Sequence, residues 1–195
     1  MTAVHSSHLV LGGARSGKSR YVVEQAAQSG RRVAFLATAR GLDGDMAARI
    51  ARHRAERPAR FTTLEEPQDI VAACRRAATA HDLILVDCVT VWVANLMERG
   101  DDDAAVLAAA DDLAKLLRER VVSLLIVSNE VGEGVHPSTE LGRRYRDLLG
   151  SVNQRLAAAA DRVTLMVAGL PMSVPIPAKD APPPPARRDP THEAP

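Results

Sequence analysis

The chain has 195 residues, 46% of them hydrophobic, and its 25 basic and 24 acidic residues leave a formal net charge of +1 at pH 7. This length suits one α/β domain with a sizeable core. The near-neutral charge gives no reason to expect binding to nucleic acid or to an anionic membrane surface. The longest apolar run, within residues 121–127, falls far short of the ~20 residues that span a membrane.

The two ends of the chain differ from its middle in composition. Residues 1–7 contain no basic region followed by an apolar segment, so we expect a disordered leader and no signal peptide. Nine of the twelve prolines lie between Pro171 and Pro195. We therefore expect residues 173–195 to form an extended, disordered tail, with a ligand for a proline-reading domain as the alternative. Cys74 and Cys88 are far apart and lack metal-ligand spacing, which favours a reducing, cytoplasmic compartment.

The first motif in the chain is GGARSGKS at residues 12–19, which matches the phosphate-binding pattern G-x-x-x-x-G-K-[ST]. An apolar strand precedes it at 8–11, and a segment with helical spacing follows it at 19–27. Glycines let backbone N–H groups point at phosphate oxygens, and the helix N-terminus adds partial positive charge. The motif predicts binding of a nucleoside triphosphate by Gly12, Gly13, Ala14, Arg15, Ser16, Gly17, Lys18 and Ser19. We expect Lys18 to reach the β- and γ-phosphates and Ser19 to bind Mg²⁺.

Two buried strands are predicted at 32–37 and 83–87, and polar residues follow or end them. Open parallel sheets bind ligands at the carboxyl ends of their strands, so residues 38–40 are expected to line the nucleotide site. An ordinary connecting loop is the alternative. Asp87 ends the second strand, and we expect its carboxylate to reach the Mg²⁺ held by Ser19.

Between these strands, residues 43–57 are expected to form a helix that carries His53 among four arginines. Helical spacing from Met46 and Ile50 alone favours a packing role for His53. Flanking guanidinium groups favour a neutral imidazole and attract phosphate, which makes the same residue a candidate nucleophile.

The remaining chain alternates between predicted helices and strands. In chain order we expect a strand at 60–64, a helix at 68–80, helices at 89–97 and 104–120, a strand at 121–127, a helix from 138 and a strand at 162–168. The long helix has an apolar stripe made of Leu141, Tyr145, Leu148, Val152 and Leu156. This alternation predicts an α/β fold with a doubly wound, mainly parallel sheet in a single P-loop NTPase domain over residues 8–172.

Polar residues also follow the strand at 121–127. Asn129 and Glu130 are candidates for sensing the γ-phosphate or positioning a nucleophile, although simple loop polarity explains them almost as well. The two glycines of the loop at 131–137 suit a moving lid. The chain lacks the N-K-x-D motif that a signalling GTPase would carry. Its small size, near-neutral charge and glycine-containing loop favour phosphoryl transfer to a small molecule.

Several segments occur together in a fixed order. They are GGARSGKSR, FLATA followed by D-x-[DE]-M-A-A-R-I, H-R-x-x-R-P, LVDC followed by T-x-W-x-x-N-L, SNEVG-x-G-x-x-P and VNQRLAAAAD. In this combination residues 8–172 resemble the bifunctional adenosylcobinamide kinase/adenosylcobinamide-phosphate guanylyltransferase family of cobalamin biosynthesis, which has a RecA-like fold. The proline-rich tail lies outside the pattern.

The resemblance implies two reactions and their substrates. ATP or GTP phosphorylates the aminopropanol hydroxyl of adenosylcobinamide, and GMP then passes from GTP to that phosphate through a guanylyl-histidine. The family's histidine corresponds to His53, where Arg52 replaces a second histidine present in many relatives. Guanine-nucleotide contacts are implied for Ala37, Thr38, Ala39, Arg54, Ala55, Glu56, Arg57, Glu65 and Asp87. The resemblance also implies Mg²⁺ as cofactor and a homotrimer.

Two other functions are compatible with the phosphate loop. An unrelated small-molecule P-loop kinase would form no covalent nucleotide adduct. A non-enzymatic switch would bind nucleotide without transferring it.

Overall fold

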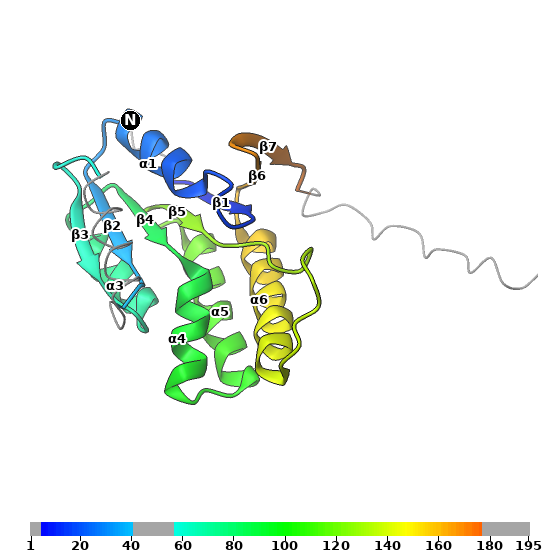
Figure 1. Cartoon of the computed structure of the whole chain (residues 1–195). Coiled ribbons are helices and arrows are strands. Elements are labelled where there is room, and N and C mark those ends of the chain that lie inside the picture. Colours follow the sequence, from blue (N-terminus) through cyan, green and yellow to red (C-terminus); the bar gives the residue numbers. More distant parts are fainter. Residues whose placement is uncertain (1–4, 41–56, 177–195) are drawn as a thin grey trace, which may run out of the picture.

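A computed structural model describes residues 5–40 and 57–176 of the chain. Its centre is a seven-stranded sheet in the order β3-β2-β4-β5-β1-β6-β7, with helices on both faces (Figure 1). All neighbouring strands are parallel except β6 and β7, which are antiparallel. The strands are β1 (Ser7–Gly12), β2 (Val33–Ala37), β3 (Thr62–Glu65), β4 (Leu83–Asp87), β5 (Ser123–Val127), β6 (Arg162–Val167) and β7 (Leu170–Val174).

The described helices form two layers, one on each face of the sheet. They are α1 (Lys18–Gln28), α3 (Ile70–Ala77), α4 (Val89–Arg99), α5 (Asp103–Glu119) and α6 (Glu140–Ala159). The side chains of successive strand residues alternate between these layers. Leu9 belongs to the hydrophobic cluster that contains residues of α3, α4, α5 and α6, whereas Val10 belongs to the cluster that contains Val22 and Ala26 of α1. The central strands are buried on both faces for this reason, which explains their continuous apolar runs.

This arrangement confirms the α/β fold with a doubly wound, mainly parallel sheet that the sequence predicts. The described elements also follow the expected chain order, with boundaries that differ by a few residues. The predicted helix at 43–57 lies almost wholly outside the described residues, so its structure stays a prediction. No helix in the described ranges is long and apolar enough to cross a membrane.

Three details of the fold differ from the sequence-based expectations. Leu141 is 65% exposed, although the apolar stripe predicts its burial, because the first turn of α6 extends beyond the core that begins at Leu148. Residues 170–174 form β7, so regular structure runs two residues past the expected domain end at 172. Pro171 is tolerated there because β7 is an edge strand, where a missing backbone N–H breaks no further ladder.

The start of β1 is likewise one residue earlier than expected. Ser7 pairs with Leu124 of β5, and its N–H and hydroxyl both donate to the Asp161 carboxylate, at 2.9 and 3.1 Å. These bonds join the start of β1 to the residue before β6, at the end of β1 opposite the phosphate loop.

Candidate functional site

The phosphate loop connects β1 to α1 and takes a conformation that requires glycine at two places. Gly12 has φ +149°, and a Cβ there would lie 2.6 Å from the carbonyl oxygen of Met166. Gly17 has φ +93° and precedes the first turn of α1. Both φ values lie where L side chains are rare. The close approach of β6 and the helix start therefore explain why these two positions of the motif are glycine.

Lys18 lies against the inside of this loop. Its Nζ donates to the carbonyl oxygens of Gly12 and Gly13, at 2.8 and 2.6 Å, and the side chain is buried. Ser16 is buried beside it, whereas Gly13, Ala14 and Arg15 at the tip are exposed. The ammonium group is thus held beside the backbone of the phosphate loop, as expected for a phosphate site.

The predicted nucleotide residues of β2, β3 and β4 lie side by side at the carboxyl edge of the sheet. Ala37 is in register with Glu65 on one side and with Asp87 on the other. The N–H of Glu66 donates to the Ala37 carbonyl at 3.0 Å. The structure therefore brings together three residues that lie up to 50 positions apart in the sequence.

Thr38 is at this edge too, but its hydroxyl is used within the protein. The side chain is fully buried, donates to the Cys88 carbonyl at 2.8 Å and accepts from the Cys88 N–H at 2.9 Å. The Thr38 N–H donates to the Asp87 carbonyl at 3.1 Å. In this arrangement Thr38 joins β2 to the end of β4, and its expected contact with nucleotide stays a prediction.

Cys88 follows Asp87 directly, and its thiol is a poor nucleophile. Burial raises the pKa of the Cys88 thiol to about 11, and the neighbouring Asp87 carboxylate adds to the effect. A thiol in this state remains protonated at neutral pH, whereas the thiolate is the reactive form.

The segment after β5 is attached to the phosphate loop and to two helices. The Glu130 N–H donates to the Gly12 carbonyl at 3.1 Å. Thr90 of α4 accepts from the Asn129 N–H at 2.7 Å, and Asn153 of α6 donates to the Asn129 carbonyl at 2.9 Å. The backbone of Asn129 is thereby fixed on both sides beside the loop. This geometry supports the interpretation of Asn129 and Glu130 as residues of the phosphate region.

The sequence analysis quotes the residues that hold these loops within the motifs T-x-W-x-x-N-L and VNQRLAAAAD but assigns them no role. Thr90, Asn95 and Asn153 are buried polar side chains on otherwise apolar helix faces. Buried amides and hydroxyls need partners, and each of the three contacts backbone just beyond the carboxyl end of a strand. The available signal was a polar residue within a helical apolar stripe, which marks a buried hydrogen bond.

The predicted nucleophile and its neighbours are outside the described part of the chain. His53, Arg54, Ala55 and Glu56 lie in the undescribed range 41–56. Arg57 is described, and its guanidinium carbon lies 3.5 Å from the centroid of the Phe35 ring in β2. This contact places Arg57 on the face of the sheet that α1 covers. Its expected contact with nucleotide is untested.

Ser19 and Asp87 provide the donor types that Mg²⁺ prefers. Ser19 is in the first turn of α1, and Asp87 ends β4, one of the strands that α1 packs against. In the part of the chain that the structure describes, no three His, Cys, Asp or Glu side chains gather as a metal site. A hydroxyl and a single carboxylate nevertheless fit Mg²⁺, which completes its shell with water and nucleotide phosphates.

The model of the cobinamide kinase / cobinamide phosphate guanyltransferase family matches residues 8–174. The chain belongs to this family. It is 48% identical over 164 residues to the bifunctional adenosylcobalamin biosynthesis protein CobP of Pseudomonas aeruginosa, covering 84% of this chain and 94% of that protein. It is 40% identical over 174 residues to the bifunctional adenosylcobalamin biosynthesis protein CobU of Salmonella typhimurium, covering 83% and 96%.

Among solved structures, the cobinamide kinase / guanyltransferase chain is similar to an ATPase of a bacterial type III secretion system. The TM-score is 0.53 at 15% identity, and the similarity covers 86% of this chain and 56% of that chain. At this identity the similarity shows the fold alone, which is that of a P-loop NTPase. The resemblance drawn from the sequence motifs is confirmed by the family match.

Proposed function

We propose that this chain catalyses both reactions of its family on one nucleotide site. The first phosphorylates the aminopropanol hydroxyl of adenosylcobinamide with ATP or GTP. The second transfers GMP from GTP to adenosylcobinamide phosphate and releases pyrophosphate, giving adenosylcobinamide-GDP. The observation that carries this proposal is the family match over residues 8–174, which includes the whole phosphate loop and the edge formed by β2, β3 and β4.

On the phosphate side, the chain contributes positive charge and oriented donors. Lys18 and the loop N–H groups bind the β- and γ-phosphates, and the N-terminus of α1 adds its partial charge. Ser19 and Asp87 would hold Mg²⁺, which neutralises charge on the phosphate oxygens when it is bound. This fixed electrostatic environment favours the charge that develops on the leaving group.

For guanylyl transfer we assign His53 as the nucleophile. A neutral imidazole nitrogen attacks the α-phosphorus of GTP, a P–N bond forms, and the bond to the β-phosphate oxygen breaks to release pyrophosphate. The imidazole loses its proton to solvent. An oxygen of adenosylcobinamide phosphate then attacks the same phosphorus, the P–N bond breaks, and the imidazole nitrogen takes up a proton from solvent, which regenerates the neutral histidine. Two easier steps thus replace one difficult transfer.

For guanine recognition we assign residues at the ends of β2 and β3. Glu65 would accept hydrogen bonds from guanine N1–H and N2–H and so replace the absent N-K-x-D motif. Its register with Ala37 supports this assignment, because Glu65 and Ala37 then lie at the same carboxyl edge of the sheet as Asp87. Ala37, Thr38, Ala39, Arg54, Ala55, Glu56 and Arg57 would provide the remaining contacts.

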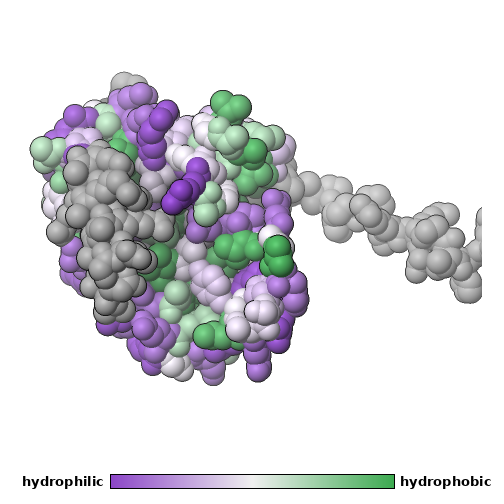
Figure 2. All heavy atoms as spheres, in the orientation of Figure 1, coloured by the Kyte–Doolittle hydropathy of each residue, from purple (hydrophilic) through white to green (hydrophobic). Residues whose placement is uncertain are grey.

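For assembly we propose a homotrimer in which β7 contributes to the subunit interface. Leu170 and Met172 of this edge strand are 68% and 54% exposed, and Val167 of β6 is 47% exposed. Figure 2 shows hydrophobic residues gathered in the region of β7. An apolar, unpaired strand edge is a surface that proteins usually cover. The free cysteines Cys74 and Cys88 are compatible with the cytoplasmic location that we propose.

The decisive test uses GTP labelled at the α-phosphate. Purified protein is incubated with this GTP and Mg²⁺ but without corrinoid, then examined by intact-protein mass spectrometry beside a His53→Ala variant. We expect a GMP-sized, acid-labile adduct that is absent from the variant. An adduct that persists in His53→Ala would move the nucleophile to another residue, and no adduct despite GTP binding would contradict the covalent mechanism.

A further inference from the structure

The turn between β6 and β7 lies against the phosphate loop (Figure 1). The two strands are joined by Ala168 and Gly169, with φ +51° and +84°. Positive φ at both central residues is typical of a type I′ turn, whose twist matches that of the flanking strands. The N–H of Gly169 donates to the carbonyl oxygen of Ser16, in the phosphate loop, at 3.0 Å. A turn near the end of the described chain thus contacts the first motif of the sequence.

The same region meets the loop at both of its ends. Gly12, which begins the loop, is in register with Met166 of β6. At the other end, a Cβ on Gly17 would lie 3.3 Å from the Cα of Gly169 and 3.8 Å from the Cε of Met166. The loop is therefore packed closely against β6 and the turn that follows it.

The bond from Gly169 fixes the direction of one peptide group of the loop. A trans peptide is planar, so the carbonyl of Ser16 and the N–H of Gly17 point in opposite directions. Because the Ser16 carbonyl faces the turn, the Gly17 N–H faces away from it. In the described ranges 5–40 and 57–176, this N–H donates to no protein acceptor. Backbone N–H groups of this kind are the donors with which a phosphate loop binds phosphate oxygens.

The hairpin of β6 and β7 is not explained by burial of β7. All five residues of β7 are exposed, so this strand adds no side chain to the core of the described chain. Ala168 nevertheless has φ +51°, which residues with a Cβ rarely adopt. Strain of this kind persists only where the surrounding structure fixes it, and it is concentrated at functional sites. The contacts of the turn with the phosphate loop supply such a constraint.

We propose that Gly169 is a positioning residue for the binding of nucleoside triphosphates. By holding the Ser16 carbonyl, its N–H directs the Gly17 N–H at a phosphate oxygen of the nucleotide. Gly169 acts through the backbone of the loop and touches no nucleotide in this scheme. Glycine takes φ near +84° without strain, so the residue type at 169 controls the turn. The inference rests on the proposed binding of triphosphate by this loop and is independent of the guanylyl-histidine.

The test measures the affinity of the full chain for phosphate groups when the turn is disturbed. Gly169→Val places a β-branched residue at a positive φ, which disfavours the type I′ turn. The ligands are ATP, tripolyphosphate and α,β-methylene GTP, in which the bond to the leaving pyrophosphate cannot break.

In equilibrium binding with Mg²⁺, we expect Gly169→Val to raise all three Kd values by about 10- to 100-fold, the loss expected for one hydrogen bond to a charged group. The factor should be the same for the three ligands, because they share the phosphate chain. Gly169→Asn is expected to recover part of the affinity, since asparagine tolerates positive φ.

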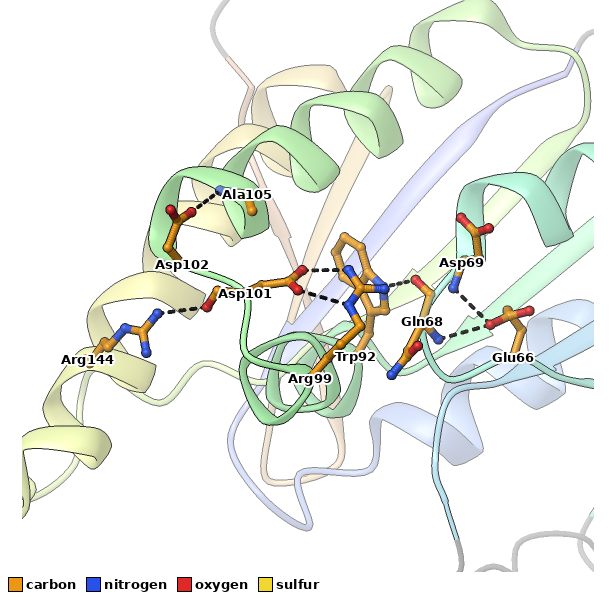
Figure 3. A network of polar contacts seen from close by, with 9 residues as sticks. All are labelled: Glu66, Gln68, Asp69, Trp92, Arg99, Asp101, Asp102, Ala105 and Arg144. Atoms are coloured by element: carbon orange, nitrogen blue, oxygen red, sulfur yellow. Dashed lines mark hydrogen bonds and ion pairs between the residues drawn. The ribbon is translucent and has the colours of Figure 1, made fainter.

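Gly100→Val provides the matched control. Gly100 has φ +101°, and the space around its Cβ is open, as it is at Gly169. It lies between Arg99 and Asp101, whose side chains form an ion pair at the end of α4 (Figure 3). The substitution therefore introduces the same kind of backbone strain in the turn that joins α4 to α5. We expect Gly100→Val to bind tripolyphosphate with the wild-type Kd.

A second control separates the turn from subunit assembly. Met172→Lys changes the exposed surface of β7 but leaves the turn intact, and we expect the wild-type Kd for tripolyphosphate. Urea unfolding and sedimentation are followed for every variant. If Gly169→Val unfolds, Gly169→Ala takes its place, with an expected rise in Kd of about threefold to tenfold.

Each outcome decides the matter. A wild-type Kd for tripolyphosphate in folded Gly169→Val or Gly169→Ala would overturn the proposal. Equal weakening in Gly100→Val or Met172→Lys would also overturn it, because the loss would then reflect general destabilisation or changed assembly. The same holds for a loss confined to the guanine nucleotide, since tripolyphosphate and ATP contain no guanine. A wild-type chain that binds none of the three ligands would instead refute the proposed nucleotide site, which is a result distinct from failure of the role given to Gly169.

Discussion

Protonation of a buried histidine should destabilise the fold below neutral pH. His8 of β1 is 6% exposed, its Nδ1 accepts from the Arg162 guanidinium at 2.9 Å, and its Nε2 lies 2.8 Å from the Thr164 hydroxyl. The Tyr21 ring of α1 meets it edge-on. Burial, and then the positive charge of Arg162, lower the pKa of His8 from 6.5 to about 4. The neutral ring is therefore the form that the folded state accommodates.

The size of the effect follows from proton linkage. With a pKa near 6.5 when unfolded and about 4 when folded, the unfolded chain binds the extra proton as the pH falls between these values. Stability is thus fully present above pH 6.5 and is lost on acidification. Between pH 7.5 and pH 5.0 the loss of stability attributable to His8 is at most about 2 kcal/mol.

Urea denaturation followed by circular dichroism, without nucleotide, measures this loss. Wild-type protein and His8→Gln are unfolded at pH 7.5 and at pH 5.0. We expect the wild type to lose up to about 2 kcal/mol more than the variant, which is a relative shift in urea midpoint of up to about 1 M at a typical slope. Equal pH dependence of the two proteins would refute a buried, neutral His8.

Three other substitutions test separate features. Lys18→Ala removes the ammonium that lies against the Gly12 and Gly13 carbonyls, and both transfer rates should fall by on the order of 100-fold or more with the circular-dichroism spectrum unchanged. Asp102→Ala removes the carboxylate that accepts from the Ala105 N–H at 2.8 Å at the start of α5, and chemical denaturation should show a loss of about 1 kcal/mol. Met172→Lys places charge on the apolar edge of β7, and sedimentation should then show a monomer with a native spectrum.

The fold was predictable because its signals are local and repeated. Each central strand is a continuous apolar run, since helices cover both faces of the sheet. The phosphate loop was equally visible, because the backbone conformations at Gly12 and Gly17 restrict the residue type to glycine. Leu141 was misjudged because periodicity reports one face of a helix but not how far along the helix the core extends.

The candidate site was predictable only in part. Asp87 was predicted from the end of a strand and Glu65 from the family resemblance, and the register of both with Ala37 explains why they lie close together. Their contacts with nucleotide and Mg²⁺ stay predictions. Asn95 and Asn153 were overlooked because a polar residue in an apolar stripe does not reveal its partner. Their partners are backbone carbonyls 57 and 24 residues away, which only a folded chain brings within 3 Å.

The sequence by itself determined the nucleotide loop, the alternation of strands and helices, and membership in the cobinamide kinase / guanyltransferase family. These depend on residue type and spacing along the chain. Only the tertiary structure decided that β7 adds an antiparallel edge strand and that the Thr38 hydroxyl faces Cys88. It also decided that Asn95 of α4 donates to the carbonyl of Thr38, where the connection that contains His53 begins. Such contacts depend on which buried polar groups meet across the sheet, and hydrogen bonding of those groups in a dry interior decides their arrangement.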